Sequence, residues 1–201
     1  MSDLFDTPPD STELSEEDKE GLIPGHITFR HELNAAEQAN ILDARVWALG
    51  RKHKNLLTEA FLKKLHKQMY GQVWKWAGQF RRKELNIGVP YHQIPTEVKK
   101  MFDDVAYWLE QDNGLTHDEI AAQLHHRITY IHPFPNGNGR LARMMADLLL
   151  EQLKCPPFTW GTGDHQGDAI ISDPAVRERY VQAVKAADGK NFEPLMGFVR
   201  S

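Results

Sequence analysis

The sequence contains only one cysteine and no long apolar run, and these two features exclude several classes of protein. Cys155 cannot form an internal disulfide, which favours a reducing cytoplasm over an extracellular location. No run of about 18 apolar residues is present, so we expect no transmembrane helix. Residues 1–20 are acidic and carry no apolar segment of the kind found in secretory signals. The composition therefore predicts a cytoplasmic protein.

The chain also lacks an excess of positive charge, since its formal net charge is −4. We therefore expect neither nucleic acid nor a membrane surface as a partner. With 201 residues, of which 41% are hydrophobic, the chain can bury one sizeable core, and no internal repeat divides it. We expect an acidic N-terminal tail at residues 1–20, with a possible short helix over 15–20, and a single domain at residues 21–201.

Capping residues and apolar spacing predict that this domain is mainly α-helical. Asn34 followed by Glu37 fits a helix start, and Pro95 suits the first position of a later helix. The expected helices cover residues 34–49, 58–70, 95–109, 116–131 and 140–153, with two more that begin at 173–174 and at 191. The exception is the segment 80–94, where polar and apolar residues alternate around Gly88 and Pro90. This pattern predicts an irregular β-hairpin.

The densest group of chemically useful residues is HPFPNGNGR, residues 132–140, with Arg143 just beyond it. A helix ends at His132, a loop turns through two glycines, and a new helix begins near Asn138. The free N–H groups of that helix start, with nearby arginines, make an anion site. His132 can accept a proton near neutral pH. The arrangement predicts phosphoryl or nucleotidyl chemistry, although such a loop can also be a turn with solvated arginines.

Other residues offer weaker alternatives. The pair His117-Asp118 occurs in metal phosphohydrolases, but both residues fall in a capped first helical turn. His125 and His126 diverge on a helix, and His132 lies too far along for a shared zinc site. A group of aromatic residues could stack on a nucleobase, with core packing as the other reading; it comprises Trp74, Trp76 and Phe80.

HPFPNGNGR followed by Arg143 resembles the signature of the Fic/Doc family. The segments EGLIPGHIT, VWKWAGQFR and NIGVPYHQIP, with residues 158–161, are similar to a bacterial subgroup described as mobile mystery protein B. The resemblance covers roughly residues 20 to 165. It implies the Fic fold, a mainly α helical-bundle core with a β-hairpin flap, preceded by an N-terminal inhibitory-type segment.

The resemblance implies a nucleotidyltransferase that moves AMP from ATP to a Ser, Thr or Tyr hydroxyl of a cytosolic target protein. It makes His132 the general base and Phe134 a buried support of the loop. Phosphate binding falls to the residues Gly137, Asn138, Gly139, Arg140 and Arg143, the last of these on the γ-phosphate. Gly139 favours AMP transfer over phosphate transfer. The target would pair with flap residues Asn86, Ile87, Val89 and His92.

Asn136 departs from the family pattern, which has Asp or Glu at this position to hold Mg²⁺. We expect weakened metal binding, because an amide supplies no charge. Glu20, followed by Gly21, resembles the inhibitory glutamate of the family, with Arg143 as its partner. A small antitoxin-like partner is the other possible source of inhibition. The alternative function is a catalytically weak Fic fold that binds nucleotide or a protein, or that uses another phosphate-containing donor.

Overall fold

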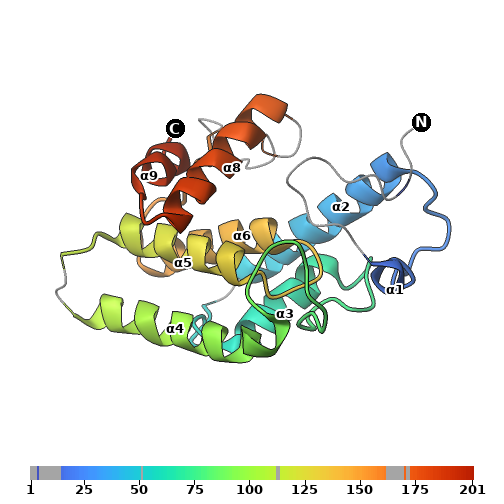
Figure 1. Cartoon of the computed structure of the whole chain (residues 1–201), viewed down its shortest axis with the longest axis horizontal. Helices are drawn as coiled ribbons and strands as arrows, with labels where there is room; N and C mark the ends of the chain where they lie inside the picture. The colour runs from blue at the N-terminus through green and yellow to red at the C-terminus, as the bar shows by residue number, and fades with distance from the viewer. Residues whose placement is uncertain (1–3, 5–14, 51, 112–113, 162–169, 171–172) are drawn as a thin grey trace.

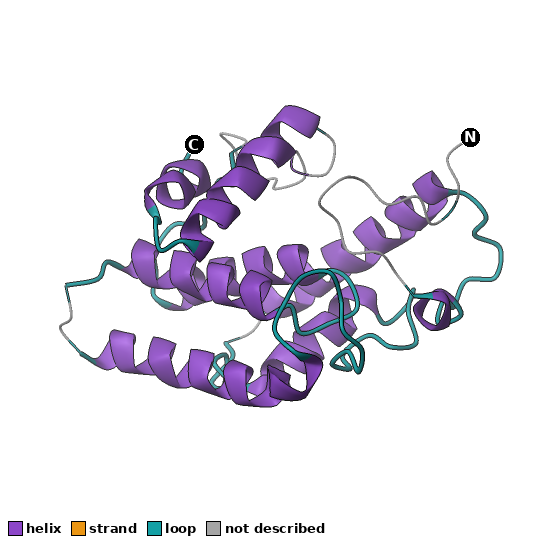
Figure 2. Cartoon of the chain, viewed as in Figure 1, coloured by secondary structure: helices purple, strands orange, loops and turns teal. Residues whose placement is uncertain are grey.

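The computed structural model describes residues 4, 15–50, 52–111, 114–161, 170 and 173–201. These residues form helices and loops and no β-strand (Figure 2), so the mainly α prediction is confirmed. The described helices are α1 (Glu16–Lys19), α2 (Arg30–Leu49), α3 (Glu59–Tyr70), η1 (Tyr91–Gln93), α4 (Ile94–Glu110), α5 (His117–Ile131), α6 (Asn138–Gln152), α8 (Pro174–Asp188) and α9 (Glu193–Val199). Within the described ranges, no helix has the length and apolar content that a membrane span requires.

Helices α5 and α6 pack against each other at the centre of the domain. Figure 1 shows α4 on one side of α5 and the α8–α9 pair on the other, and both sets contact α5. Helix α2 packs along α3, and both of these helices also contact α6. The apolar segment of α6 is buried, as its sequence predicts, with Leu141, Met145 and Leu150 fully covered. The loop between α5 and α6, which carries the predicted site, is therefore held by the most buried pair of helices.

The starts of α3 and α5 lie where the capping residues place them. The Thr58 hydroxyl accepts a hydrogen bond from the Phe61 N–H at 3.2 Å. Thr116 and Glu119 form a reciprocal capping box, with the Thr116 N–H donating to the Glu119 carboxylate at 2.7 Å and the Glu119 N–H donating to the Thr116 hydroxyl at 3.2 Å. Each cap satisfies N–H groups that the helix itself leaves free. Helix α5 then runs directly to His132.

The predicted start of α2 at Asn34 is wrong, because the helix begins at Arg30. The Glu32 carboxylate accepts hydrogen bonds from the backbone N–H groups of Thr28 at 2.9 Å and Phe29 at 3.0 Å. This earlier cap removes the need for one at Asn34. Glu37, which the sequence suggested as part of a cap, lies instead in the middle of the helix and is buried.

The segment 80–94 is a loop followed by η1, and the predicted β-hairpin is not formed. A single buried side chain, that of Arg81, takes the place of a ladder of cross-strand hydrogen bonds. Its Nη1 donates to the carbonyl oxygen of Lys83 at 2.9 Å, and its Nη2 donates to the carbonyl oxygen of Val89. Its Nε donates to the carbonyl oxygen of His132 at 2.8 Å. Arg81 thus fastens the loop to the segment that carries the predicted site.

Candidate active site in the α5–α6 loop

His132 ends helix α5 in the left-handed backbone region, with φ of +52°. Its Nδ1 lies 3.3 Å from the carbonyl oxygen of Thr129. A carbonyl oxygen can only accept, so Nδ1 carries the proton and Nε2 carries the lone pair. The tautomer therefore makes Nε2 the atom that can take a proton from a substrate.

The residue is also held in its neutral form. Burial lowers the pKa of His132 to about 4, and the positive charge of Arg81 lowers the pKa further, while the hydrogen bond to Thr129 raises it. A neutral imidazole at pH 7 is the state in which a histidine acts as a general base.

The loop after His132 closes on itself around Asn138. The Asn138 Oδ1 accepts from the Phe134 N–H at 2.9 Å, and its Nδ2 donates to the Phe134 carbonyl oxygen at 2.9 Å. The Phe134 ring is fully buried and stacks on the ring of His66, with centroids 3.8 Å apart. The Asn138 side chain thus closes the loop, with its oxygen and one Nδ2 hydrogen both bonded to the Phe134 backbone.

Glycine stands at positions 137 and 139 of the loop for different physical reasons. Gly137 has φ of +79°, and a Cβ there would stand 2.5 Å from the Tyr70 ring, so the fold itself requires glycine. A Cβ on Gly139 would meet only the Tyr180 hydroxyl at 3.5 Å and the Arg143 guanidinium at 3.9 Å, which are ordinary contacts. The protein does not require glycine at 139. Because Gly139 has no side chain, space remains beside the first turn of α6, where the helix presents free N–H groups and its positive end.

Arg140 is held by an acidic partner that sequence analysis missed. Its Nη1 donates to the Glu37 carboxylate at 2.7 Å, and the other oxygen of Glu37 accepts from the Trp74 indole N–H at 2.7 Å. The guanidinium also lies 5.1 Å from the centroid of the Tyr70 ring. Burial by itself would lower the pKa of Arg140, but Glu37 outweighs it and raises that pKa above the usual range. Arg140 is therefore a guanidinium held in place by an ion pair beside the predicted anion site.

We expect Glu37→Gln to lower the free energy of unfolding by about 2 kcal/mol, because it removes the negative charge that balances Arg140. Urea unfolding measures this change. Glu59→Gln is the matched control, since the Glu59–Lys63 ion pair is much more exposed, and we expect a loss there of less than about 0.5 kcal/mol. Equal losses in the two variants would contradict a special position for Glu37.

Arg143 lies in a separate buried polar cluster. Its guanidinium is 5.5 Å from the centroid of the Tyr180 ring, and the Tyr180 hydroxyl is 2.9 Å from the His125 Nε2. One turn further along α6, burial raises the pKa of Asp147 to about 6, although its hydrogen bonds from Trp160 and from the Phe158 N–H act in the opposite direction. The two motif arginines are thus supported by different helices, Arg140 by α2 and Arg143 by α8.

The predicted flap contacts the site directly. A Cβ on Gly88, whose φ is +100°, would stand 2.7 Å from the Cβ of His132, so the loop lies against the candidate base. Within the predicted docking set, Asn86, Ile87 and His92 are exposed. Val89 is buried, and its N–H donates to the Ile131 carbonyl oxygen at 3.3 Å. Its backbone is therefore already used within the protein.

Glu20 lies at the end of α1 and is exposed. In the described part of the chain, no ion pair or hydrogen bond joins its carboxylate to Arg143. Helix α1 is nevertheless docked, because the Trp76 indole N–H donates to the Asp18 carbonyl oxygen at 3.0 Å and Glu17 pairs with Lys83. The structure thus places the predicted inhibitory segment against the flap loop and does not bring Glu20 and Arg143 together.

Asn136 does not offer the donor set that Mg²⁺ prefers. Its side-chain Oδ1 accepts from the Gly137 N–H at 2.6 Å, and the amide carries no charge. Among the residues that the structure describes, no group of three His, Cys, Asp or Glu side chains could hold a metal ion. The residues at this position therefore do not fit Mg²⁺, which is bound mainly by charged oxygens and water.

The weaker alternatives from the sequence gain no support. Trp74 is buried and stacks on Trp76 with centroids 5.0 Å apart, so these rings pack the core. Asp118 forms a two-pronged ion pair with Arg200, with N···O distances of 2.7 and 2.5 Å, which accounts for its charge without a metal.

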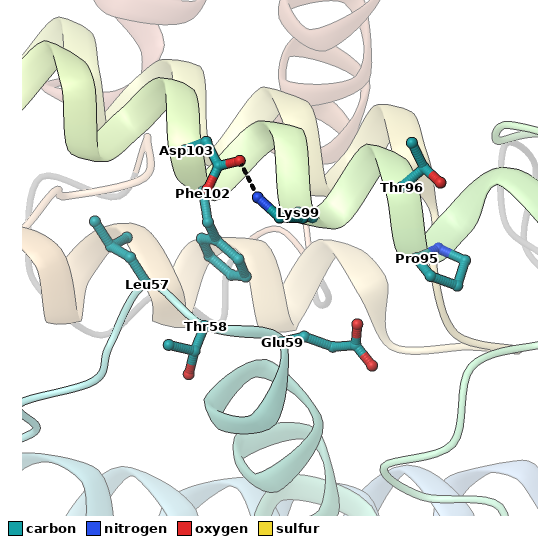
Figure 3. Close-up of a pocket in the computed structure, with 8 residues that line it drawn as sticks. All are labelled: Leu57, Thr58, Glu59, Pro95, Thr96, Lys99, Phe102 and Asp103. Carbon is teal, nitrogen blue, oxygen red and sulfur yellow. Dashed lines mark hydrogen bonds and ion pairs between the residues drawn. The ribbon is translucent and has the colours of Figure 1, made fainter.

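Two surface pockets lie away from the motif. The larger, of about 560 Å³, lies between the start of α3 and the first turns of α4, and Figure 3 shows Phe102 pointing from α4 toward α3 while Lys99 pairs with Asp103. The second, of about 380 Å³, lies under the flap loop and includes Arg81 and Tyr91. Neither pocket is lined by a residue of 132–143.

Comparison with known proteins gives matches over most of the chain. Residues 56–150 match the model of the Fic/DOC family. The chain is 28% identical over 138 residues to Protein adenylyltransferase Fic of Drosophila mojavensis, which covers 67% of this chain. It is 24% identical over 181 residues to Protein adenylyltransferase fic-1 of Caenorhabditis elegans, which covers 89% of this chain. The chain spans only 25% and 33% of the length of these two relatives.

The fold is likewise similar to that of a solved structure, the BepC protein of Bartonella tribocorum with bound AMPPNP. The TM-score is 0.64 at 19% identity, and the match covers 92% of this chain and 96% of that one. Together with the helical core and the His132–Arg143 loop, these matches show that the chain is similar to proteins of the Fic/DOC family, whose model covers residues 56–150. Its assignment to a bacterial subgroup stays a prediction.

Proposed function

We propose that this chain transfers AMP from ATP to the hydroxyl group of a serine, threonine or tyrosine in a target protein. The observation that carries the proposal is the tautomer of His132, whose Nε2 lone pair stands at the start of the loop that leads into α6. The open space at Gly139 and the fixed charge of Arg140 support phosphate binding at the same helix start. Relatives named protein adenylyltransferase agree with this class of reaction.

In the proposed reaction, Nε2 of His132 takes the proton of the target hydroxyl. The hydroxyl oxygen forms a bond to the α-phosphorus of ATP, and the bond from that phosphorus to the oxygen bridging the α- and β-phosphates breaks. Pyrophosphate leaves with the electron pair. Backbone N–H groups at the start of α6, with Arg140 and Arg143, would stabilise the negative charge on the phosphates. The exposed flap residues Asn86 and Ile87 would guide the target chain.

We further propose that Glu20 inhibits this reaction in cis by turning toward Arg143 and excluding the γ-phosphate. The docking of α1 on Trp76 and Lys83 supports this proposal, because it keeps Glu20 beside the flap loop. Inhibition within the chain would need no separate antitoxin-like partner.

We expect Glu20→Gly to raise self-modification by ATP at least about tenfold, which corresponds to removing roughly 1.4 kcal/mol of competition for the site. The intact mass of the protein after incubation with ATP measures the gain and distinguishes AMP from phosphate. Glu16→Gln is the matched control, since Glu16 is an exposed glutamate of the same helix. The double variant Glu20→Gly/His132→Ala should gain no mass. An unchanged rate in Glu20→Gly would contradict inhibition by Glu20.

A catalytically weak Fic fold that binds nucleotide or a protein partner is the second candidate. Two observations favour it: the Asn136 amide supplies no charge for a metal, and Arg140 is already paired with Glu37. Under this alternative the Glu20→Gly protein would bind ATP and gain no mass.

A further inference from the structure

The backbone of Asn136 is held in one orientation by a buried histidine. The Gly78 N–H donates to Nδ1 of His66 at 2.9 Å, so this nitrogen carries the lone pair and the ring proton is on Nε2. Nε2 lies 3.1 Å from the Asn136 carbonyl oxygen, to which it donates. Burial lowers the pKa of His66 to about 3, and so the ring stays neutral at physiological pH. The peptide group between Asn136 and Gly137 is therefore fixed from the protein side.

The Asn136 side chain is fixed as well. Because the Gly137 N–H can only donate, the amide must present its oxygen to it, at an N···O distance of 2.6 Å. With the oxygen facing the Gly137 N–H, the Nδ2 group of the amide points away from it. In the described residues Nδ2 has no hydrogen-bond partner, and the side chain is only half-buried. Position 136 thus presents two free N–H donors beside the start of α6.

The charges around Asn136 suit an anion better than a cation. Arg140 and Arg143 lie on the helix that follows it, and the positive end of α6 faces the same loop. The acidic side chain that pairs with Arg140 is Glu37, and both of its oxygens are used, one by Trp74 and one by Arg140. Among the residues that the structure describes, no charged oxygen is left unused at this position to attract Mg²⁺, whereas a phosphate oxygen would find donors.

We propose that this loop binds the phosphates of ATP without a divalent cation, with Nδ2 of Asn136 donating a hydrogen bond to a phosphate oxygen. The inference rests on the proposed function in one respect, since it takes ATP as the nucleotide of the same site. The two arginines and the helix start supply the positive charge that a metal ion would otherwise provide. ATP binding by the loop can be measured without turnover.

The test compares the ATP affinity of the whole chain in Mg²⁺ and in excess EDTA, by isothermal titration calorimetry. For the wild type we expect the Kd to change less than about threefold between the two conditions. Asn136→Asp is the matched variant, because a carboxylate keeps the shape and still accepts from Gly137 but loses the free donors and adds a negative charge. We expect it to bind ATP about tenfold or more weakly in EDTA than in Mg²⁺, a difference of roughly 1.4 kcal/mol. Thermal unfolding of both proteins shows whether the variant is folded.

A wild type whose ATP affinity falls tenfold or more in EDTA would overturn the inference, and so would a variant that behaves as the wild type does. A wild type that binds no ATP in either condition overturns it too. The outcome is separable from the proposed function. ATP binding in EDTA without AMP transfer supports the inference and contradicts the transferase, whereas AMP transfer with strictly Mg²⁺-dependent binding does the reverse.

Discussion

His132→Ala is expected to reduce AMP transfer by about 10²- to 10⁴-fold, the usual contribution of a positioned general base. The reason is geometric: the hydrogen bond from Nδ1 to Thr129 leaves Nε2 as the proton acceptor, and burial keeps the ring neutral. The ATP affinity should change less than about twofold, because phosphate binding is assigned to the start of α6 and to the arginines. Initial rates of AMP incorporation with the Glu20→Gly background, together with calorimetry, measure both quantities.

The matched control for this prediction is His26→Ala, which removes an exposed histidine far along the chain from the motif. We expect it to leave the rate of AMP transfer unchanged. A His132→Ala protein that retains more than about a tenth of the rate would contradict its assignment as the base.

Acidification should destabilise the protein strongly. In the folded state the pKa of His66 is lowered to about 3 and that of His132 to about 4, in each case mainly by burial, from an ordinary value of 6.5. Between pH 6.5 and pH 4 the unfolded chain binds more protons than the folded one, so the free energy of unfolding falls as the pH falls. Each histidine contributes a loss of about 3 kcal/mol over this interval, at roughly 1.4 kcal/mol per pH unit. Burial also lowers the pKa of His125, which adds to the loss.

One buried acid acts in the opposite direction. The pKa of Asp147 is raised to about 6 by burial, from 3.8, so its contribution to stability grows as the pH falls through this range. Three histidines outweigh one carboxyl group, and we expect a net loss of at least about 3 kcal/mol between pH 6.5 and pH 4. Urea unfolding at a series of pH values measures the loss. Asp147→Asn should make the dependence on pH steeper, and a stability that is flat or rises on acidification would contradict the account.

The helices of this domain follow closely from local signals in the sequence. Thr58 and the Thr116–Glu119 pair start α3 and α5 at the residues expected, because a side-chain cap needs only its own neighbours. The start of α2 was not predictable from Asn34 and Glu37, since the Glu32 carboxylate provides an equivalent cap earlier. The hairpin prediction fails for a non-local reason. Arg81 binds the flap loop to His132 across the fold, and alternation along the chain cannot reveal such a contact.

In the candidate site, too, the local features could be predicted from the sequence and the long-range contacts could not. The loop from His132 to Arg140 could be recognised from its residues, because histidine, glycines and arginines fall together in the sequence. The contacts of Glu37 and His66 could not be predicted, since these residues reach the loop from α2 and α3 and their partners lie far along the chain. The clue to Glu37 was available: a charged residue that shares a helix face with buried Leu33 and Ala44 needs a partner.

The central claim is that His132 directs the transfer of AMP from ATP to a protein hydroxyl. The most direct measurement incubates the Glu20→Gly protein with ATP that carries a radioactive phosphorus label at either the α or the γ position, and follows protein-bound label. Our account predicts label on the protein from the α position alone, and none after His132→Ala. Label from the γ position would instead show phosphate transfer, and no label from either position would contradict catalysis by this site.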